Sequence, residues 1–361
     1  MSTFCRHLTN GLVYNNNTQS FTVSPCCYFS KTDIVQQDLT HYRSQWQKSD
    51  LQKNCRICIH AESTGLHSYR QASFEWLDGI GDAIEFLTIA VNKKCNLACV
   101  SCDANSSSFW YQENIRNNIP QPKNVQKLHA DDRQGEITKN FLSLLESQDL
   151  SKLKYIKFGG GEPLMTDTHL QVLKLVTNPE NVTLQYTSNF SLMPSNKVFK
   201  EWEKFKLVKW VASVDGVGDQ FSFLRWPYRW EKLNDFVKTA KHSVPSNIMF
   251  GVEHTLNPLN VFYFDRFQTW FDQTIATNKY GDPSDLNLHL CNGNLGIAQT
   301  PPALRKIIED KFGTEHSVVS MLQQNPYQQH TTMVKYLNQL DLLRCQQWRK
   351  IFPEVSEYFD V

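Results

Sequence analysis

The sequence predicts an α/β fold, a partial (β/α)6 barrel of the TIM type, with a small irregular lobe before it and helices after it. From about residue 84 onward, short apolar runs alternate with helix-patterned stretches. Such alternation is typical of βαβ units that build a parallel sheet. Glycine-rich or polar residues follow most of the apolar runs directly, at the position where the loops of a parallel barrel build its active site.

Six apolar runs are predicted to form the parallel strands. They cover residues 85–91, 153–158, 182–187, 207–214, 248–255 and 286–290. Helical patterns between them include residues 169–176, 197–205, 230–242 and 261–273. Six strand–helix units of this length fit a barrel that does not close.

The flanking segments have a different character. Residues 1–82 are rich in Asn, Gln, Ser and Thr, contain five cysteines and show little helical periodicity, so we expect a cysteine-rich, metal-stapled lobe. Residues 83–298 form the predicted barrel. Residues 299–361 are predicted to be a helical extension that packs over an edge of the barrel.

Composition and charge exclude several classes of protein. The chain has 361 residues, of which 40% are hydrophobic and 20% charged, which suffices for a large buried core. A formal net charge of +1 gives no electrostatic case for nucleic acid or an anionic membrane as partner. The N-terminus lacks the apolar run of a signal peptide, and no apolar stretch approaches the ~20 residues of a membrane helix, so we expect a cytoplasmic protein.

Three cysteines follow the first predicted strand: Cys95, Cys99 and Cys102, with the spacing C-x3-C-x2-C. A cubane iron–sulfur cluster normally takes four cysteine ligands. Three thiolates on one short loop therefore leave one iron without a protein ligand, and an open coordination position is typical of a reactive metal site. A structural zinc site or buried thiols are the alternatives, although zinc prefers four ligands.

The cysteine spacing, with Gly160-Gly161-Glu162-Pro163 after the second predicted strand, resembles the radical S-adenosylmethionine superfamily. Ser213-Val214-Asp215-Gly216 followed by Arg225 is similar to the branch with SPASM or twitch auxiliary-cluster domains. The resemblance covers roughly residues 84–290. It implies an enzyme whose 4Fe–4S cluster binds S-adenosylmethionine, cleaves it reductively to a 5′-deoxyadenosyl radical, and so abstracts hydrogen from a substrate.

The resemblance also implies roles for single residues. Cys95, Cys99 and Cys102 would ligate the cluster. The residues that match S-adenosylmethionine-binding positions are Asp103, Gly160, Gly161, Glu162, Pro163, Ser188, Asn189, Ser213 and Arg225. Glycines would let backbone approach the methionine amino group, and an arginine suits a carboxylate. Turn capping by the serines and the asparagine, and an ion pair of the arginine, are the alternatives.

One position departs from the family. The residue before the third cysteine is usually aromatic there, and in this chain it is Ser101. The departure weakens a stacking contact to the adenine but leaves the three cysteine ligands in place.

The N-terminal cysteines resemble the same branch. Asn54-Cys55-x2-Cys58 looks like the closing half of a SPASM or twitch segment, and Pro25-Cys26-Cys27 like its opening hairpin. In most such enzymes this module follows the barrel, whereas here it precedes it. The resemblance implies a second 4Fe–4S cluster on Cys5, Cys26, Cys55 and Cys58, with Cys27 spare or exchanging with Cys26. Because C-x2-C pairs serve both metals, structural zinc is the alternative.

Three further residues on the predicted strands or just after them permit two interpretations. Cys291 follows the sixth strand and is a candidate hydrogen-atom or proton donor, with a small buried core residue as the alternative. His254 and His289 lie on predicted strands and face either the barrel interior or the core.

The resemblance also suggests a substrate class. Substrates in this branch are often ribosomally made peptides, so modification of a peptide or protein side chain is the first expectation by family analogy. No winged-helix peptide-recognition module is evident, which leaves a small-molecule substrate open. A non-catalytic iron–sulfur scaffold or partner subunit is the alternative from a different class. An electron donor such as flavodoxin or ferredoxin would be the protein partner.

Overall fold

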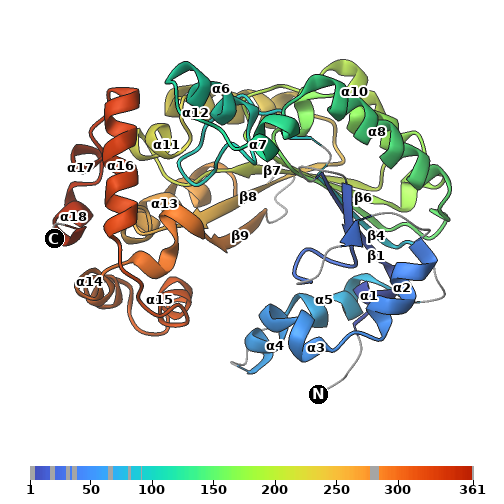
Figure 1. Ribbon diagram of the computed structural model, residues 1–361, viewed down its shortest axis with the longest axis horizontal. Helices are drawn as coiled ribbons and strands as arrows, with labels where there is room; N and C mark the ends of the chain where they lie inside the picture. The colour runs from blue at the N-terminus through green and yellow to red at the C-terminus, as the bar shows by residue number, and fades with distance from the viewer. Residues whose placement is uncertain are drawn as a thin grey trace.

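In the computed structural model, which describes residues 5–16, 21–29, 33–34, 39–63, 68–79, 83–90, 92–276 and 284–359, a nine-stranded sheet organises the chain. The strands follow the order β3-β2-β1-β4-β5-β6-β7-β8-β9, so β3 and β9 are its edges and the barrel is partial (Figure 1). The bounds are β1 (Gly11–Asn16), β2 (Phe21–Ser24), β3 (Asp33–Ile34), β4 (Phe86–Ala90), β5 (Tyr155–Phe158), β6 (Thr183–Ser188), β7 (Leu207–Ser213), β8 (Ile248–Leu256) and β9 (Asp285–Leu290).

Strands β4 to β9 confirm the six predicted strands. Each pairs with the next in parallel, as expected for βαβ units. Their bounds lie within two residues of the predicted ones, except that Val91, the last residue of the first predicted strand, lies outside the described residues.

Helices connect the parallel strands and cover one face of the sheet. Between β4 and β5 lie α6 (Ser108–Arg116), α7 (Lys123–Leu128) and α8 (Asp131–Glu146). The later crossovers contain α9 (Thr168–Leu173), α10 (Asn196–Trp202), α11 (Asp219–Leu224), α12 (Trp230–Ser243) and α13 (Phe264–Thr274). Four of these, α9, α10, α12 and α13, occupy the predicted helical ranges.

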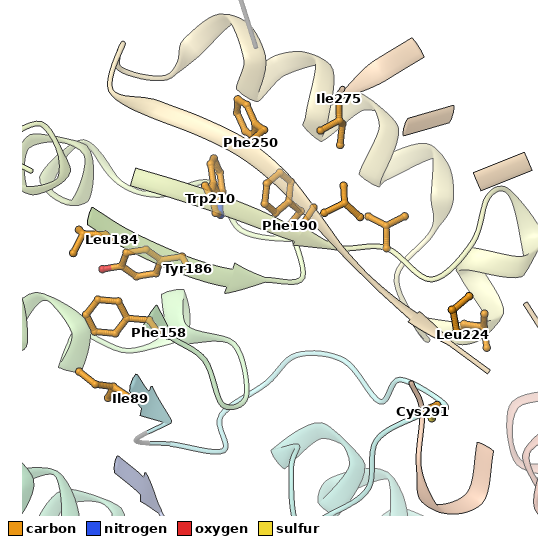
Figure 2. Packing of buried hydrophobic residues seen from close by; sticks show 14 of the residues in the cluster. Ile89, Phe158, Leu184, Tyr186, Phe190, Trp210, Leu224, Phe250, Ile275 and Cys291 are labelled. Atoms are coloured by element: carbon orange, nitrogen blue, oxygen red, sulfur yellow. The ribbon is translucent and has the colours of Figure 1, made fainter. Parts of the chain in front are cut away.

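The hydrophobic core lies between the sheet and these helices. Figure 2 shows Ile89, Phe158, Tyr186 and Trp210 in a row on successive strands. The ring of Tyr186 lies 4.7 Å from that of Trp202 on α10, measured between centroids. Since side chains alternate along a strand, the residues between these apolar ones point to the opposite face of the sheet.

The N-terminal lobe is more regular than its composition suggests. Its strand β1 pairs in parallel with β4 and in antiparallel with β2, so the lobe extends the barrel sheet at one edge. Five helices accompany it within the described part of the lobe: α1 (His7–Asn10), α2 (Leu39–Gln47), α3 (Leu51–Asn54), α4 (Arg56–Ser63) and α5 (Tyr69–Trp76). Each has nine residues or fewer, which is too short for a clear helical period in the sequence.

The C-terminal extension is helical, as predicted. It contains α14 (Pro302–Phe312), α15 (Ser317–Gln323), α16 (Thr331–Arg344), α17 (Trp348–Ile351) and α18 (Pro353–Ser356). These helices lie at the end of the molecule away from the N-terminal lobe (Figure 1). Phe352 contacts Phe223 of α11 at 5.6 Å between ring centroids, so the extension packs on the barrel helices. Among the described residues, none of the helices has the length and apolarity to cross a membrane.

Candidate cluster and cofactor site

The cysteine loop follows β4 and is tied to the segment that follows β7. Ala98 N donates to Trp226 O over 2.7 Å, and Val100 N donates to Leu224 O over 2.8 Å. The indole of Trp110 donates to Cys99 O over 2.8 Å. These bonds satisfy the backbone groups on both sides of Cys99 and fix the shape of the loop.

Helix α16 of the C-terminal extension supports the same loop. Arg344 Nη2 donates to Ala98 O over 3.0 Å, and Tyr336 OH donates to Val100 O over 2.9 Å. The guanidinium also lies 2.7 Å from a carboxylate oxygen of Glu113, and the Arg344 side chain is only 1% exposed. Nothing in the sequence pointed to these contacts, because the paired residues lie far apart along the chain.

The glycine loop after β5 packs directly against the cysteine loop. Gly161 N donates to Asn92 O over 3.1 Å, and Glu162 N donates to Lys94 O over 2.7 Å. A Cβ atom on Gly161 would lie 2.2 Å from Lys94 O, and one on Gly160, whose φ is +108°, would lie 2.8 Å from Asn92 O. Contact between the two loops therefore requires both glycines.

Glu162 joins the glycine loop to the end of β6. Its carboxylate accepts hydrogen bonds from Asn189 N at 2.7 Å, Ser188 Oγ at 3.0 Å and Leu164 N at 3.2 Å. Burial raises the pKa of this carboxyl to about 7. Pro163 begins the short 3-10 turn that follows. The structure thus brings together Glu162, Ser188 and Asn189, three of the predicted site residues.

Two side chains place hydrogen-bond donors near the sulfur atoms of the loop. Asn189 Nδ2 lies 4.0 Å from Cys95 Sγ and donates to Asn96 Oδ1 over 2.8 Å. Arg225 Nη1 lies 3.8 Å from Cys99 Sγ, while its Nε lies 2.7 Å from Asp215 Oδ2. Asp215 is buried and orients Arg225, a role that the sequence analysis missed although its motif contained the residue.

The donor set fits an iron–sulfur cluster in chemical type. Cys99 and Cys102 share a hydrogen bond that lowers the pKa of Cys99, with a further contribution from Arg225, and raises that of Cys102. The thiolate is the form that binds metal. Within the described ranges, no three His, Cys, Asp or Glu side chains are already gathered in a metal-binding arrangement.

The remaining predicted site residues are Asp103, Ser213 and Cys291. Asp103 is exposed, and its side chain accepts a hydrogen bond from Asn105 N in its own turn. Ser213 ends β7, in register with Glu253. Cys291 is buried, with its Sγ 3.4 Å from Asn292 O, and burial raises its pKa to about 12. Cys291 belongs to the cluster of buried hydrophobic residues and is labelled in Figure 2.

The N-terminal cysteines separate into a group of four and a single residue. Cys5, Cys26, Cys55 and Cys58 are all buried and line one small cavity. Burial is the main cause that raises the pKa of each of these thiols, that of Cys55 to about 12. Cys27 is exposed and lines a different, larger cavity.

The larger cavity lies on the face of the sheet opposite the apolar core, and we call it the lumen cavity. Its volume is about 900 Å³. Strands β4 to β9 line it with alternate residues, and the N-terminal lobe closes one side. The lining residues are Cys27, Tyr28, Tyr69, Trp76, Phe86, Thr88, Lys154, Tyr155, Lys157, Asn181, Thr183, Gln185, Lys206, Lys209, Glu253, Asn287 and His289.

A hydrogen-bonded group centred on Glu253 lies in the lumen cavity. Glu253 Oε1 accepts hydrogen bonds from Lys157 Nζ at 3.0 Å, Gln185 Nε2 at 3.2 Å and Thr187 Oγ1 at 3.1 Å. His289 Nε2 lies 3.8 Å from the same oxygen. Burial alone would raise the pKa of Glu253, but His289 and Lys157 lower it to about 2. Of the two strand histidines, His289 therefore faces the interior.

The other strand histidine, His254, faces the core. Its side chain is buried and its Nδ1 lies 2.8 Å from Val214 O. Burial lowers its pKa to about 4, so the ring is neutral.

Comparison with known proteins gives distant relatives. No family model matches the chain. The uncharacterized protein MJ0907 of Methanocaldococcus jannaschii is 24% identical over 289 residues, which are 75% of this chain and 85% of that protein.

Similar solved structures share part of the chain trace at low identity. The structure of anSMEcpe with bound AdoMet and Cp18Cys peptide has a TM-score of 0.39 at 15% identity over 67% of this chain, which spans 62% of that protein. TYW1 with a lysine-pyruvate adduct bound has a TM-score of 0.34 at 11% identity, covering 63% of this chain and 71% of its own. Streptococcus suis SuiB has a TM-score of 0.33 at 10% identity, covering 84% of this chain and 69% of its own.

Proposed function

We propose that this chain is a radical S-adenosylmethionine enzyme in which Cys95, Cys99 and Cys102 ligate a 4Fe–4S cluster. One observation carries the proposal: the cysteine loop and the glycine loop are hydrogen-bonded to each other, Glu162 N to Lys94 O over 2.7 Å, after the adjacent parallel strands β4 and β5. Loops at the carboxyl ends of parallel barrel strands build active sites. A reactive centre is therefore expected at this position, where the chain brings together three thiols, two hydrogen-bond donors near sulfur and a glycine turn.

When bound, the cluster and S-adenosylmethionine would supply one-electron chemistry that ends in hydrogen-atom abstraction from the substrate. The residues of this chain would bind and orient the cluster and S-adenosylmethionine. Arg225, held by Asp215, can donate to a carboxylate group. Glu162 fixes the backbone of Asn189, whose amide faces Cys95. Preorganised groups of this kind lower the cost of reorganisation during the reaction.

We also propose that residues 1–82 form an auxiliary-cluster lobe beside the barrel of residues 83–298, with 299–361 as the helical extension. The support is that Cys5, Cys26, Cys55 and Cys58 line one cavity. Tyr28 and Tyr69 line both this cavity and the lumen cavity, so a cluster held there would lie beside the substrate space. Zinc is the alternative metal for four thiols.

The substrate that we propose is a peptide or protein side chain. A lumen cavity of about 900 Å³, partly closed by the N-terminal lobe, can receive a side chain together with flanking residues. A small-molecule substrate is the alternative. The one-electron reduction requires a donor such as flavodoxin or ferredoxin.

The proposal is tested by anaerobic reconstitution of the full chain followed by iron and sulfide analysis. About eight irons are expected if both cysteine groups hold 4Fe–4S clusters, and about four irons with one zinc if the N-terminal group binds zinc. Dithionite and excess S-adenosylmethionine, with candidate peptides present, should then release 5′-deoxyadenosine.

A pair of cysteine variants provides the control. Cys99→Ala should lose about four irons and the release of 5′-deoxyadenosine, whereas Cys345→Ser should keep both, because Cys345 is exposed and lies outside both groups. Fully loaded, reduced protein that releases no 5′-deoxyadenosine would favour the non-catalytic scaffold over the enzyme.

A further inference from the structure

Lysines gather around the lumen cavity beyond what the overall charge predicts. Among the described residues, the cavity is lined by Lys154, Lys157, Lys206 and Lys209 and by one carboxylate, that of Glu253. The whole chain carries a net charge of only +1. A concave site lined by one sign of charge attracts ligands of the opposite sign.

The lysines form two tiers across the strands. In one tier, Lys157 on β5 and Lys209 on β7 flank Gln185 of β6 in register. In the other, Lys154 and Lys206 directly precede β5 and β7, three residues nearer the amino ends of the strands. Three residues of strand separate the tiers by about 10 Å.

Three of the four lysines are in ion pairs with carboxylates. Lys157 lies 3.0 Å from Glu253, Lys209 lies 2.6 Å from Asp285 and Lys154 lies 2.6 Å from Asp78. Across the ranges that the structure describes, Lys206 makes no ion pair, and it is exposed at the rim of the cavity.

Aromatic rings form another part of the cavity lining. Trp76 and Phe86 stack at 6.3 Å between ring centroids, and Phe86 and Tyr155 stack at 5.1 Å. Tyr69 lies edge-on to Trp76 at 5.3 Å and to Tyr28 at 5.3 Å. These rings offer an apolar surface in the same cavity as the lysines.

From this arrangement we infer that the lumen cavity binds a ligand that combines an anionic group, a carboxylate or a phosphate, with an apolar or aromatic body. The anion lies at Lys206, and the body lies against the rings of Trp76 and Phe86. Calling this ligand the substrate rests on the proposed function. The binding site itself rests on the cavity and its charges.

The position of the lysines also sets a length for the ligand. Lys206, where the anion lies, precedes the end of β7 at Ser213 by seven residues, which is about 23 Å along the strand. The cysteine loop lies beyond the ends of these strands. A substrate that reaches from Lys206 to that loop therefore spans about seven extended residues between its anionic group and its reacting atom.

The test is calorimetric titration of the full, reconstituted chain with matched probes. Acetyl-Phe-Gly-Asp-amide and acetyl-Phe-Gly-Asn-amide differ in one negative charge, and phenyl phosphate supplies the same chemistry in a small molecule. We expect the acidic peptide to bind at least tenfold more tightly than the neutral one at 50 mM salt. The difference should shrink at 300 mM salt, because salt screens exposed charges.

Two lysine variants locate the anion. Lys206→Gln should weaken binding of the anionic probe about five- to tenfold and change binding of the neutral peptide less than twofold. Lys204→Gln is the matched control, since Lys204 pairs with Glu201 outside the cavity and should change neither value more than twofold. Circular dichroism of both variants checks that they are folded.

Each outcome has a defined meaning. Tighter binding of the acidic peptide than of phenyl phosphate supports a peptide as the source of the anion, and the reverse order supports a small molecule. Equal binding of charged and neutral probes, no binding of any probe, or equal effects of the two variants would overturn the inference. Because calorimetry needs no cleavage of S-adenosylmethionine, this failure is distinguishable from failure of the proposed enzyme activity.

Discussion

The substitution Glu253→Gln tests whether the charged group in the lumen stabilises the fold. Glu253 is 13% exposed in its side chain and accepts hydrogen bonds from Lys157, Gln185 and Thr187 through one oxygen. The amide keeps the size of the carboxylate and removes its charge. Lys157, 3.0 Å away, then faces a neutral group in a partly buried site.

The magnitude follows from the pKa of Glu253, which is lowered from 4.5 to about 2. At about 1.4 kcal/mol per pKa unit, ionisation of this group favours the folded state by about 3 kcal/mol at pH 7. The unfolding entropy of a chain of 361 residues is about 0.76 kcal/mol/K at ~2.1 cal/mol/K per residue, so the melting temperature should fall by about 4 °C.

The same pKa predicts the dependence on pH. Because its pKa is lowered, the Glu253 carboxyl stabilises the folded state fully above pH 4.5. This contribution is lost as the pH falls from 4.5 through about 2. At pH 3.5 the unfolded chain binds about one more proton at this residue than the folded chain does. The difference in the free energy of unfolding between wild type and variant should therefore be about 1.4 kcal/mol smaller than at pH 7.

Differential scanning calorimetry at pH 7 and pH 3.5 measures both quantities. Glu231→Gln is the control, because Glu231 is 68% exposed and lies 3.8 Å from Arg229, so it should change stability by less than ~0.5 kcal/mol at either pH. A Glu253→Gln protein as stable as wild type at pH 7, or a gap that does not change with pH, would refute the reasoning.

Two further substitutions test the loops around the cysteines. Gly161→Ala should abolish iron loading or soluble expression, because its Cβ would lie 2.2 Å from Lys94 O, while Gly159→Ala, with no atom within 4 Å of its Cβ, should load iron normally. Arg344→Met should cost about 3–5 kcal/mol in denaturant unfolding, since it leaves Glu113 without its buried partner. Arg349→Met, on the surface beside Asn338, should cost less than ~1 kcal/mol, and an equal loss in both arginine variants would contradict the role of Arg344.

The parallel sheet could be predicted from sequence because its signal is local. Runs such as residues 207–214 are apolar and β-branched, and the polar residues directly after them end the strand. The N-terminal lobe gave no such signal. Strand β1 became part of the barrel sheet by pairing with β4, whose residues lie some 75 positions later, at Phe86 opposite Gly11.

The residues of the candidate site also fall into two groups, those that the sequence placed together and those whose contacts depend on packing. Spacing alone grouped Cys95, Cys99 and Cys102, and strand-end positions grouped Glu162 and Asn189. Asp103 matched a motif position for its backbone, and its exposed side chain accepts a hydrogen bond from Asn105 N in its own turn. A motif position fixes where a residue lies along the chain, and the packing around it decides which group its side chain contacts.

The sequence by itself determined the alternation of strands and helices and the three thiols of the cysteine loop, because both depend on residues close together in the chain. Only the tertiary structure decided what holds that loop. Arg344 reaches Ala98 across 246 residues and Tyr336 reaches Val100 across 236, contacts that no local pattern encodes. It also decided the lysine-lined cavity, since Lys157 and Lys209 come together only when β5, β6 and β7 pair in register.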